Sequence, residues 1–114
     1  MNRIPFSLPD VGLREVKGFA YLDDEFLIIE VESAVLGLTD RDRQTVKVAP
    51  SALESVRFTR GLFRDRLRIK PEKVELLKTI PGDHATEIAL RVPRKYRDLT
   101  ERIADEMDDR IALA

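Results

Sequence analysis

The stretch TEIALRVPRKYRDLTERIADEMDDRIA, residues 86–112, decides the fold because the spacing of its apolar residues changes once, at Pro93. Before Pro93 apolar and polar side chains alternate, as expected for a strand with one buried face. After it, apolar residues recur every three or four positions, which predicts an amphipathic helix over about residues 94–112. A proline fits just before or within the first helical turn, where its missing N–H costs nothing. The apolar stripe of this helix consists of Tyr96, Leu99, Ile103, Met107 and Ile111.

Upstream of the helix, the sequence predicts short strands separated by turns. The alternation is clearest in residues 25–35, which come after the acidic pair Asp23-Asp24. Residues 16–22 and 25–35 are therefore expected to form a hairpin. Later turns are marked by glycine and proline. Seven strands are expected in all, at residues 16–22, 25–35, 45–48, 53–58, 62–69, 74–80 and 86–92.

The N-terminal residues 1–14 differ from the rest of the chain, because prolines at positions 5 and 9 interrupt them and their apolar residues have no regular period. We expect an extended arm that docks in a groove of its own domain or of a neighbouring molecule. Residues 15–114 contain no repeat, low-complexity tract or linker, and a chain of this length is typical of one domain.

Seven short strands followed by one amphipathic helix is the element order of the pleckstrin-homology (PH) superfold. Over about residues 15–107 the chain resembles the bacterial PH-like families in particular, through the acidic turn, the segments APSALESV (49–56) and RGLFRDRL (60–67), and Pro81-Gly82 before the last strand. The resemblance implies a mainly β fold. It would be a partly open, seven-stranded barrel or sandwich, capped by the C-terminal amphipathic helix.

The resemblance also bears on function. Eukaryotic PH domains that bind phosphoinositides are known for basic residues around the first hairpin. The turn expected to correspond here is Asp23-Asp24-Glu25, preceded by a single Lys17, and its carboxylates would repel an inositol phosphate. Several bacterial relatives look like oligomer-forming modules, which favours an assembly role.

Composition excludes several classes of protein. The 114 residues include no cysteine, which rules out disulfide scaffolds, cysteine-ligated metals and thiol nucleophiles. With 20 basic and 21 acidic side chains the net charge is -1, so no nucleic-acid partner is expected. No apolar run approaches the roughly 20 residues of a transmembrane helix, and the proline-broken N-terminus is unlike a secretory signal. We therefore expect a cytoplasmic protein.

Motifs that carry chemistry are missing from the sequence. The only histidine, His84, lies in a predicted turn, and Asp23-Asp24-Glu25 lacks the glycine and later glutamate of a calcium loop. No phosphate-binding glycine loop, nucleophile elbow or zinc-protease motif occurs. We expect no catalytic residues, no metal and no cofactor.

The most unusual charge pattern lies in residues 57–70, which hold six basic side chains and one acid, Asp65. Because a guanidinium binds carboxylate or phosphate through two hydrogen bonds, an outward row of arginines suits an acidic partner, a phosphate or a lipid headgroup. Three interpretations stay open: neutralisation by nearby acids, pairing between subunits, and binding of a separate anionic ligand. The candidate binding residues, called the arginine stripe below, are Arg57, Arg64, Arg66 and Arg68.

The turn within this segment leads to two local expectations. A two-residue turn at residues 60–61 would pair Phe58 with Phe63 on the inner face and place Arg57 opposite Arg64 on the outer one. Strict alternation would also bury the Asp65 carboxylate. A bulge or strand end nearby is expected to prevent that burial.

The sequence therefore predicts a fold without fixing a biochemical role. The element order and the missing chemistry favour a non-catalytic interaction or assembly module. Its partner would be another protein or further copies of itself as a homo-oligomer, bound through the outer face and the arm at residues 1–14. The alternative is peripheral binding of an anionic lipid or another phosphorylated ligand by the arginine stripe.

Overall fold

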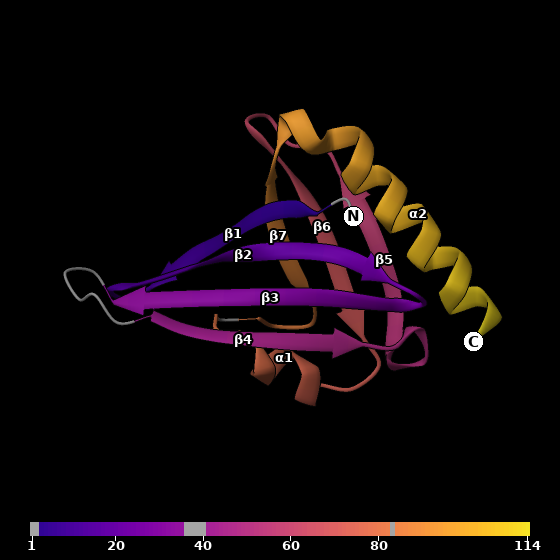
Figure 1. Cartoon of the computed structure of the whole chain (residues 1–114), viewed down its shortest axis with the longest axis horizontal. Coiled ribbons are helices and arrows are strands. Elements are labelled where there is room, and N and C mark those ends of the chain that lie inside the picture. The colour runs from indigo at the N-terminus through magenta and orange to yellow at the C-terminus, as the bar shows by residue number, and fades with distance from the viewer. Residues whose placement is uncertain (1–2, 36–40, 83) are drawn as a thin grey trace.

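Seven antiparallel strands form one open sheet in the order β4-β3-β2-β1-β7-β6-β5, as seen in a computed structural model that describes residues 3–35, 41–82 and 84–114 (Figure 1). A single long C-terminal helix caps the sheet. This confirms the predicted mainly β fold with a partly open sheet and a helical cap. The strands are β1 (Ile4–Val11), β2 (Arg14–Asp23), β3 (Phe26–Val35), β4 (Arg41–Val48), β5 (Leu53–Thr59), β6 (Arg64–Pro71) and β7 (Ile88–Pro93). The helical elements are η1 (Pro50–Ala52), α1 (Glu75–Thr79), η2 (Arg94–Tyr96) and α2 (Arg97–Leu113).

The sheet is bent where β1 meets β7. Strands β1 to β4 are consecutive antiparallel neighbours, and so are β5 to β7. Between the two groups, β1 and β7 are in register at one pair only, Ser7 with Arg91. Figure 1 shows the first group crossing in front of the second at a steep angle. We call this weakly paired boundary the seam.

The core lies between the two groups of strands and α2. Helix α2 runs along β5 (Figure 1), and buries Ile103, Ala104 and Met107. Each large apolar side chain buried in this way contributes about 1.5–3 kcal/mol to folding. The helix also covers the outer edge of β5, because the backbone N–H of Val56 donates to Oδ1 of Asp108 at 3.2 Å. Neither α1 nor α2 is long and apolar enough to cross a membrane, and these are the only α-helices in the described residues.

Residues 4–11, expected within an extended arm, form the central strand β1 instead. The chain is extended there, but Ile4, Phe6 and Leu8 alternate into the core with at most 4% of their surface exposed. Pro5 and Pro9 do not prevent this, since prolines are tolerated in strands that lack a full ladder of partners, and β1 has one register pair with β7. Residues 4–11 thus belong to the sheet and are not free to bind a neighbour.

The predicted strand at residues 74–80 is wrong, because this segment forms the short helix α1. Its buried residues, Leu77 and Ile80, are three positions apart, which is a helical rather than a strand spacing. The expected total of seven strands is met because β1 takes the place of this segment.

The presence of β1 also moves the first hairpin of the sheet. The acidic turn at residues 23–25 joins β2 to β3, whereas β1 and β2 are joined through Gly12 and Leu13. Asp24 has a positive φ of 55°, which aspartate tolerates better than most residues. The acidic turn is therefore not the first hairpin, and it gives no ground for excluding a phosphate ligand elsewhere on the protein.

Candidate functional site

The hairpin of β5 and β6 sets where the arginine stripe lies. Phe58 pairs with Leu67 rather than with Phe63, because the turn spans more than residues 60–61. The predicted two-residue turn is therefore wrong, and Phe63, expected inside, is 82% exposed. The apolar pattern alone could not reveal this, since Leu67 satisfies the inner face as well as Phe63 would.

The observed register of β5 and β6 places the arginines of the stripe in different surroundings. Arg57 lies opposite Arg68 and not opposite Arg64. Arg68 is neutralised, since Nη1 donates to Oε1 of Glu87 at 2.8 Å and Nε donates to Oγ1 of Thr59 at 3.1 Å. Arg57 is exposed and makes no ion pair with any described residue. The stripe therefore does not act as one row.

A fifth arginine, Arg91, joins the other two residues of the stripe. It stands directly opposite Arg66 on the outer face of β6 and β7. Its Nε is buried and has no hydrogen-bond partner among the described residues. An unpaired donor on a cation is costly, and two like charges in register add to that cost. The alternation in residues 86–92 points Arg91 outward, but Arg91 lies outside the run of basic residues at 57–70 and is not part of the predicted stripe.

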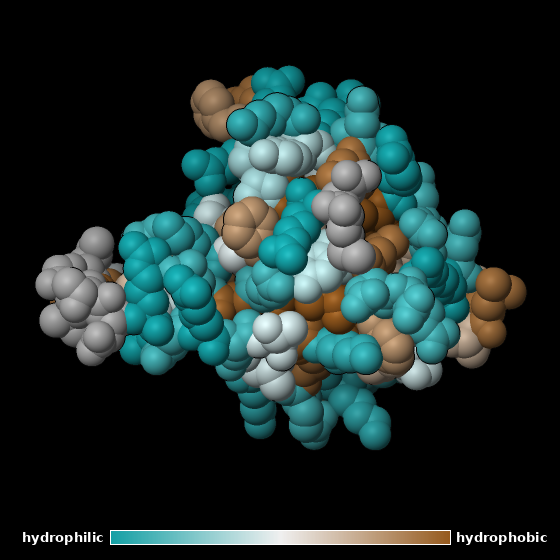
Figure 2. Space-filling model, viewed as in Figure 1, coloured by the Kyte–Doolittle hydropathy of each residue, from teal (hydrophilic) through white to brown (hydrophobic). Residues whose placement is uncertain are grey.

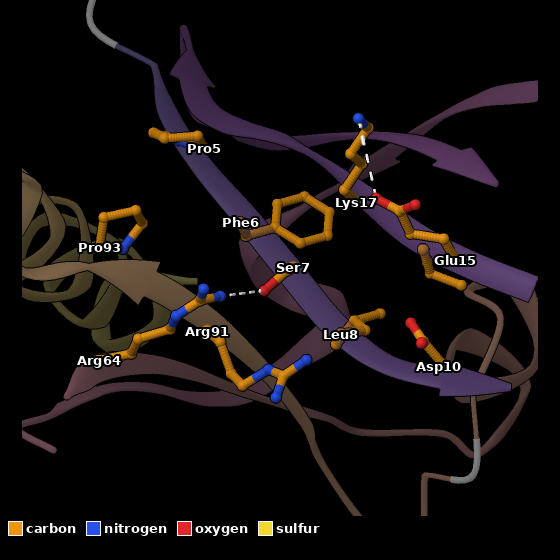
Figure 3. A pocket seen from close by; sticks show the side chains of 11 residues that line it. Pro5, Phe6, Ser7, Leu8, Asp10, Glu15, Lys17, Arg64, Arg91 and Pro93 are labelled. Atoms are coloured by element: carbon orange, nitrogen blue, oxygen red, sulfur yellow. Dashed lines mark hydrogen bonds and ion pairs between the residues drawn. The ribbon is translucent and has the colours of Figure 1, made fainter. Parts of the chain in front are cut away.

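Arg64, Arg66 and Arg91 line two adjoining hollows at the seam, which we call together the seam groove. One hollow, of about 370 Å³, lies beside β1 and is lined by Arg64, Arg91 and Ser7 (Figure 3). The other, of about 520 Å³, is lined by Arg66, Arg91 and His84. Arg91 belongs to both hollows. Because the sheet has only one register pair at the seam, a ligand there could approach side chains from β1, β6 and β7.

One polar contact already crosses the seam. Nη1 of Arg64 donates to Oγ of Ser7 at 2.8 Å, which fixes the guanidinium over the groove (Figure 3). The Arg91 side chain runs beside it and extends toward Asp10 (Figure 3). A guanidinium and a hydroxyl on the same wall are both donors to an anion.

Three carboxylates also border the seam groove. Glu87 is bound by Arg68, and Glu15 lies 3.9 Å from Nζ of Lys17. Asp10 lines both hollows and has no ion pair with any described residue. The arginines of the groove therefore outnumber its unpaired acid, and the groove can accept an anion with several oxygens.

The single acid of residues 57–70 has a structural role. The Asp65 side chain has no exposed surface, and it accepts hydrogen bonds from Nε and Nη2 of Arg97 at 2.8 and 2.9 Å. The Gly61 N–H donates to it at 3.2 Å. Strand β6 does begin near Asp65, at Arg64, but the expectation that a bulge or strand end would spare Asp65 from burial is wrong. Arg97 on α2 supplies the counter-charge that makes burial possible.

This pairing fixes the charge on Asp65. Hydrogen bonds from Arg97 lower the pKa of Asp65, against the opposing effect of burial, and the Gly61 N–H lowers it further. The same contact raises the pKa of Arg97. At neutral pH the carboxyl holds no proton to donate, so the pair serves to join β6 to α2.

The chain matches no family model, no curated protein and no solved structure. Among the described residues there is also no group of three or more side chains that could hold a metal ion. The interpretation of the site therefore depends on its geometry.

Proposed function

We propose that the protein is a non-catalytic binding module of the PH-like kind that binds a phosphate-bearing ligand in the seam groove. The observation that carries this is the pair Arg66 and Arg91, in register on one face, with the Arg91 Nε buried and without a partner among the described residues. An anion between the two guanidinium groups would offset their repulsion and accept hydrogen bonds from their Nη groups. We also propose, from the resemblance to bacterial PH-like families, that the protein is bacterial and cytoplasmic.

Binding of a protein partner or of further copies has less support than an anionic ligand. Residues 4–11 are committed to the sheet, and β4, which ends the sheet on one side, is rich in charged residues, including Arg41, Asp42, Arg43 and Lys47. Charged side chains on an edge strand oppose pairing with another strand. Recognition through the seam groove requires neither element.

The seam groove would bind its ligand mainly through charge-assisted hydrogen bonds. Arg66 and Arg91 would take the phosphate oxygens directly, because neither has an ion-pair partner among the described residues. Arg64, held by Ser7, would donate from the β1 side. Binding of this type weakens as salt screens the charges.

Calorimetry with inositol hexakisphosphate and inorganic phosphate at low salt tests the proposal. The double variant Arg66→Gln/Arg91→Gln is expected to weaken binding about 30-fold or more, since it removes two charged donors. Arg57→Gln is the control for the loss of one positive charge, because it removes an arginine from the neighbouring strand β5, outside the residues that line the groove. Equal binding by the double variant and the wild type, or no binding by the wild type, would contradict the proposal.

Asp10→Asn is expected to strengthen phosphate binding about fivefold at low salt. Asp10 lines both hollows, so its carboxylate opposes any anion held by the arginines. Glu15→Gln provides the comparison, because Lys17 already partners that carboxylate and its removal should have less effect. If Asp10→Asn weakened binding, the anion would not lie beside this residue.

A further inference from the structure

The turn between β5 and β6 presents two large apolar side chains to solvent. Leu62 is 80% exposed and Phe63 is 82% exposed. Figure 2 shows apolar atoms projecting over this end of the molecule, above a largely hydrophilic surface. Single exposed apolar residues are common on proteins, but two large neighbours on a protruding turn indicate a contact surface. We call residues 60–63 the hairpin tip.

Basic residues surround the hairpin tip. Arg60 and Arg64 flank the apolar pair in sequence, and both are exposed. From the other side, Arg94 approaches the turn, with Nη1 3.5 Å from the carbonyl oxygen of Leu62. The nearest acid in sequence, Asp65, is buried and paired with Arg97, so its charge does not offset this cluster. The tip is thus apolar at its end and cationic around its base.

The turn that carries the tip is held in one shape. The Gly61 N–H donates to the buried Asp65 carboxylate. A Cβ at Gly61 would fall far inside the contact distance of the Arg64 carbonyl oxygen, so the backbone is tightly closed at this position. Fixing the turn reduces the entropy that Leu62 and Phe63 would lose on binding. Their exposure is therefore built into the hairpin.

We propose that the hairpin tip inserts into the interface of an anionic lipid bilayer. Leu62 and Phe63 would enter the boundary between headgroups and acyl chains, and the surrounding arginines would contact the negative surface. This inference deepens the proposed function, because the phosphate bound in the seam groove would belong to a lipid headgroup. That part of the inference rests on the proposed function. Arg64 connects the two sites, because it comes directly after Phe63 and its guanidinium lines the groove.

A lipid surface fits the tip better than a pocket on another protein because of its charge. An apolar end surrounded by arginines matches an anionic bilayer, which is apolar below a negatively charged surface. A soluble partner would have to combine an apolar pocket with an acidic rim. Self-association through the tip would bring the arginines of two copies together, which like-charge repulsion opposes.

The absence of tryptophan from the sequence allows a direct test. Phe63→Trp would place one indole at the tip, and Leu113→Trp would place one at the far end of α2, where Leu113 is 88% exposed. With vesicles of phosphatidylglycerol and phosphatidylcholine, the fluorescence of the tip indole should shift to the blue and be quenched by brominated lipid. The indole on α2 should show neither change. Identical behaviour of the two reporters would overturn insertion of the tip.

A second experiment separates the tip from the seam groove. Leu62→Ser/Phe63→Ser is expected to weaken vesicle binding in co-sedimentation about 30-fold, while binding of soluble inositol hexakisphosphate stays within about twofold of the wild type. Arg66→Gln/Arg91→Gln should weaken both. If the serine variant bound vesicles as well as the wild type does, insertion of the tip would be overturned. The proposal that the seam groove binds phosphate would be unaffected. A serine variant that lost self-association, in a protein that does not bind vesicles, would show that the tip contacts protein.

A seam groove that does not bind phosphate would be recognised by a different combination of results. If soluble phosphates did not bind but the tip indole of Phe63→Trp still inserted into anionic vesicles, the proposed function of the seam groove would be wrong while insertion of the tip would hold. If that indole inserted equally well into vesicles of phosphatidylcholine alone, the arginines around the tip would have no role in membrane binding. The proposal of an anionic membrane would then be overturned.

Discussion

Arg97→Met is expected to lower the free energy of unfolding by about 3 kcal/mol at neutral pH. The loss arises at Asp65, whose side chain has no exposed surface and whose charge would be left without a counter-charge. The Gly61 N–H alone could not replace the two hydrogen bonds from Arg97. Urea denaturation followed by circular dichroism measures the change.

Two controls separate the buried charge from a general loss of packing. Asp65→Asn/Arg97→Met should be much more stable than Arg97→Met alone, because the amide is neutral and can still accept from the Gly61 N–H. Lys70→Met breaks an exposed ion pair with Glu54 and should change stability by about 0.5 kcal/mol or less. If Arg97→Met were no more harmful than Lys70→Met, the Asp65 pair would not support the fold.

The pH dependence gives a further check on the same pair. Arg97 holds the pKa of Asp65 below its ordinary value. The wild-type pair therefore contributes its full share of the folding stability above the unfolded-state pKa of about 4. That contribution is lost as the pH falls through the lowered folded-state pKa. In Arg97→Met, burial would instead raise the pKa of Asp65, and mild acid would neutralise the carboxyl and stabilise the fold. The difference in the free energy of unfolding between the wild type and Arg97→Met should therefore become smaller as the pH falls from about 7 to about 4.

Gly18→Ala is expected to lower the free energy of unfolding by about 3 kcal/mol. A Cβ at Gly18 would overlap the backbone carbonyl oxygen of Glu30 on β3 and lie 3.1 Å from Cε2 of Phe6 on β1. Phe6 is the residue in register with Gly18 across β1 and β2. Neither the β3 backbone nor the buried ring can move without disturbing the middle of the sheet.

Gly12→Ala is the matched control for this substitution. Gly12 lies in the turn between β1 and β2 with a positive φ of 63°, and no atom lies within 4 Å of the Cβ that would be added. Only the backbone strain remains, which costs about 1 kcal/mol. Thermal denaturation of both variants would show the difference, and similar melting temperatures would mean that β2 and β3 do not approach closely at Gly18.

The elements that the sequence predicted well are those with one clear period. Residues 25–35 alternate over a long run and form β3, and the stripe from Leu99 to Met107 lies on α2 as expected. Strand β1 is hard to predict because Pro5 and Pro9 interrupt the alternation of Ile4, Phe6 and Leu8. Helix α1 is only five residues long, too short for a period of 3.6 to be distinguished from one of two.

The candidate site could be predicted only in part, because register is a property of the sheet. The basic character of residues 57–70 is evident from sequence, and two of its residues, Arg64 and Arg66, line the seam groove. That Glu87 would neutralise Arg68, or that Arg91 would face Arg66, depends on the pairing of β6 with β7. A local sequence pattern indicates which face of the sheet a side chain takes, but not which residue of a strand distant in sequence lies opposite it.

The pairing of the first strand with the last has a consequence for how the protein forms during synthesis. Strands β1 to β4 are joined as successive hairpins, so they can assemble as soon as they leave the ribosome. The contact of Ser7 with Arg91 spans most of the chain, and closing so long a loop is slow. We therefore expect the boundary between β1 and β7 to form last, after α2 has been made. Until then the inner apolar residues of β1 stay open to water and to chaperones.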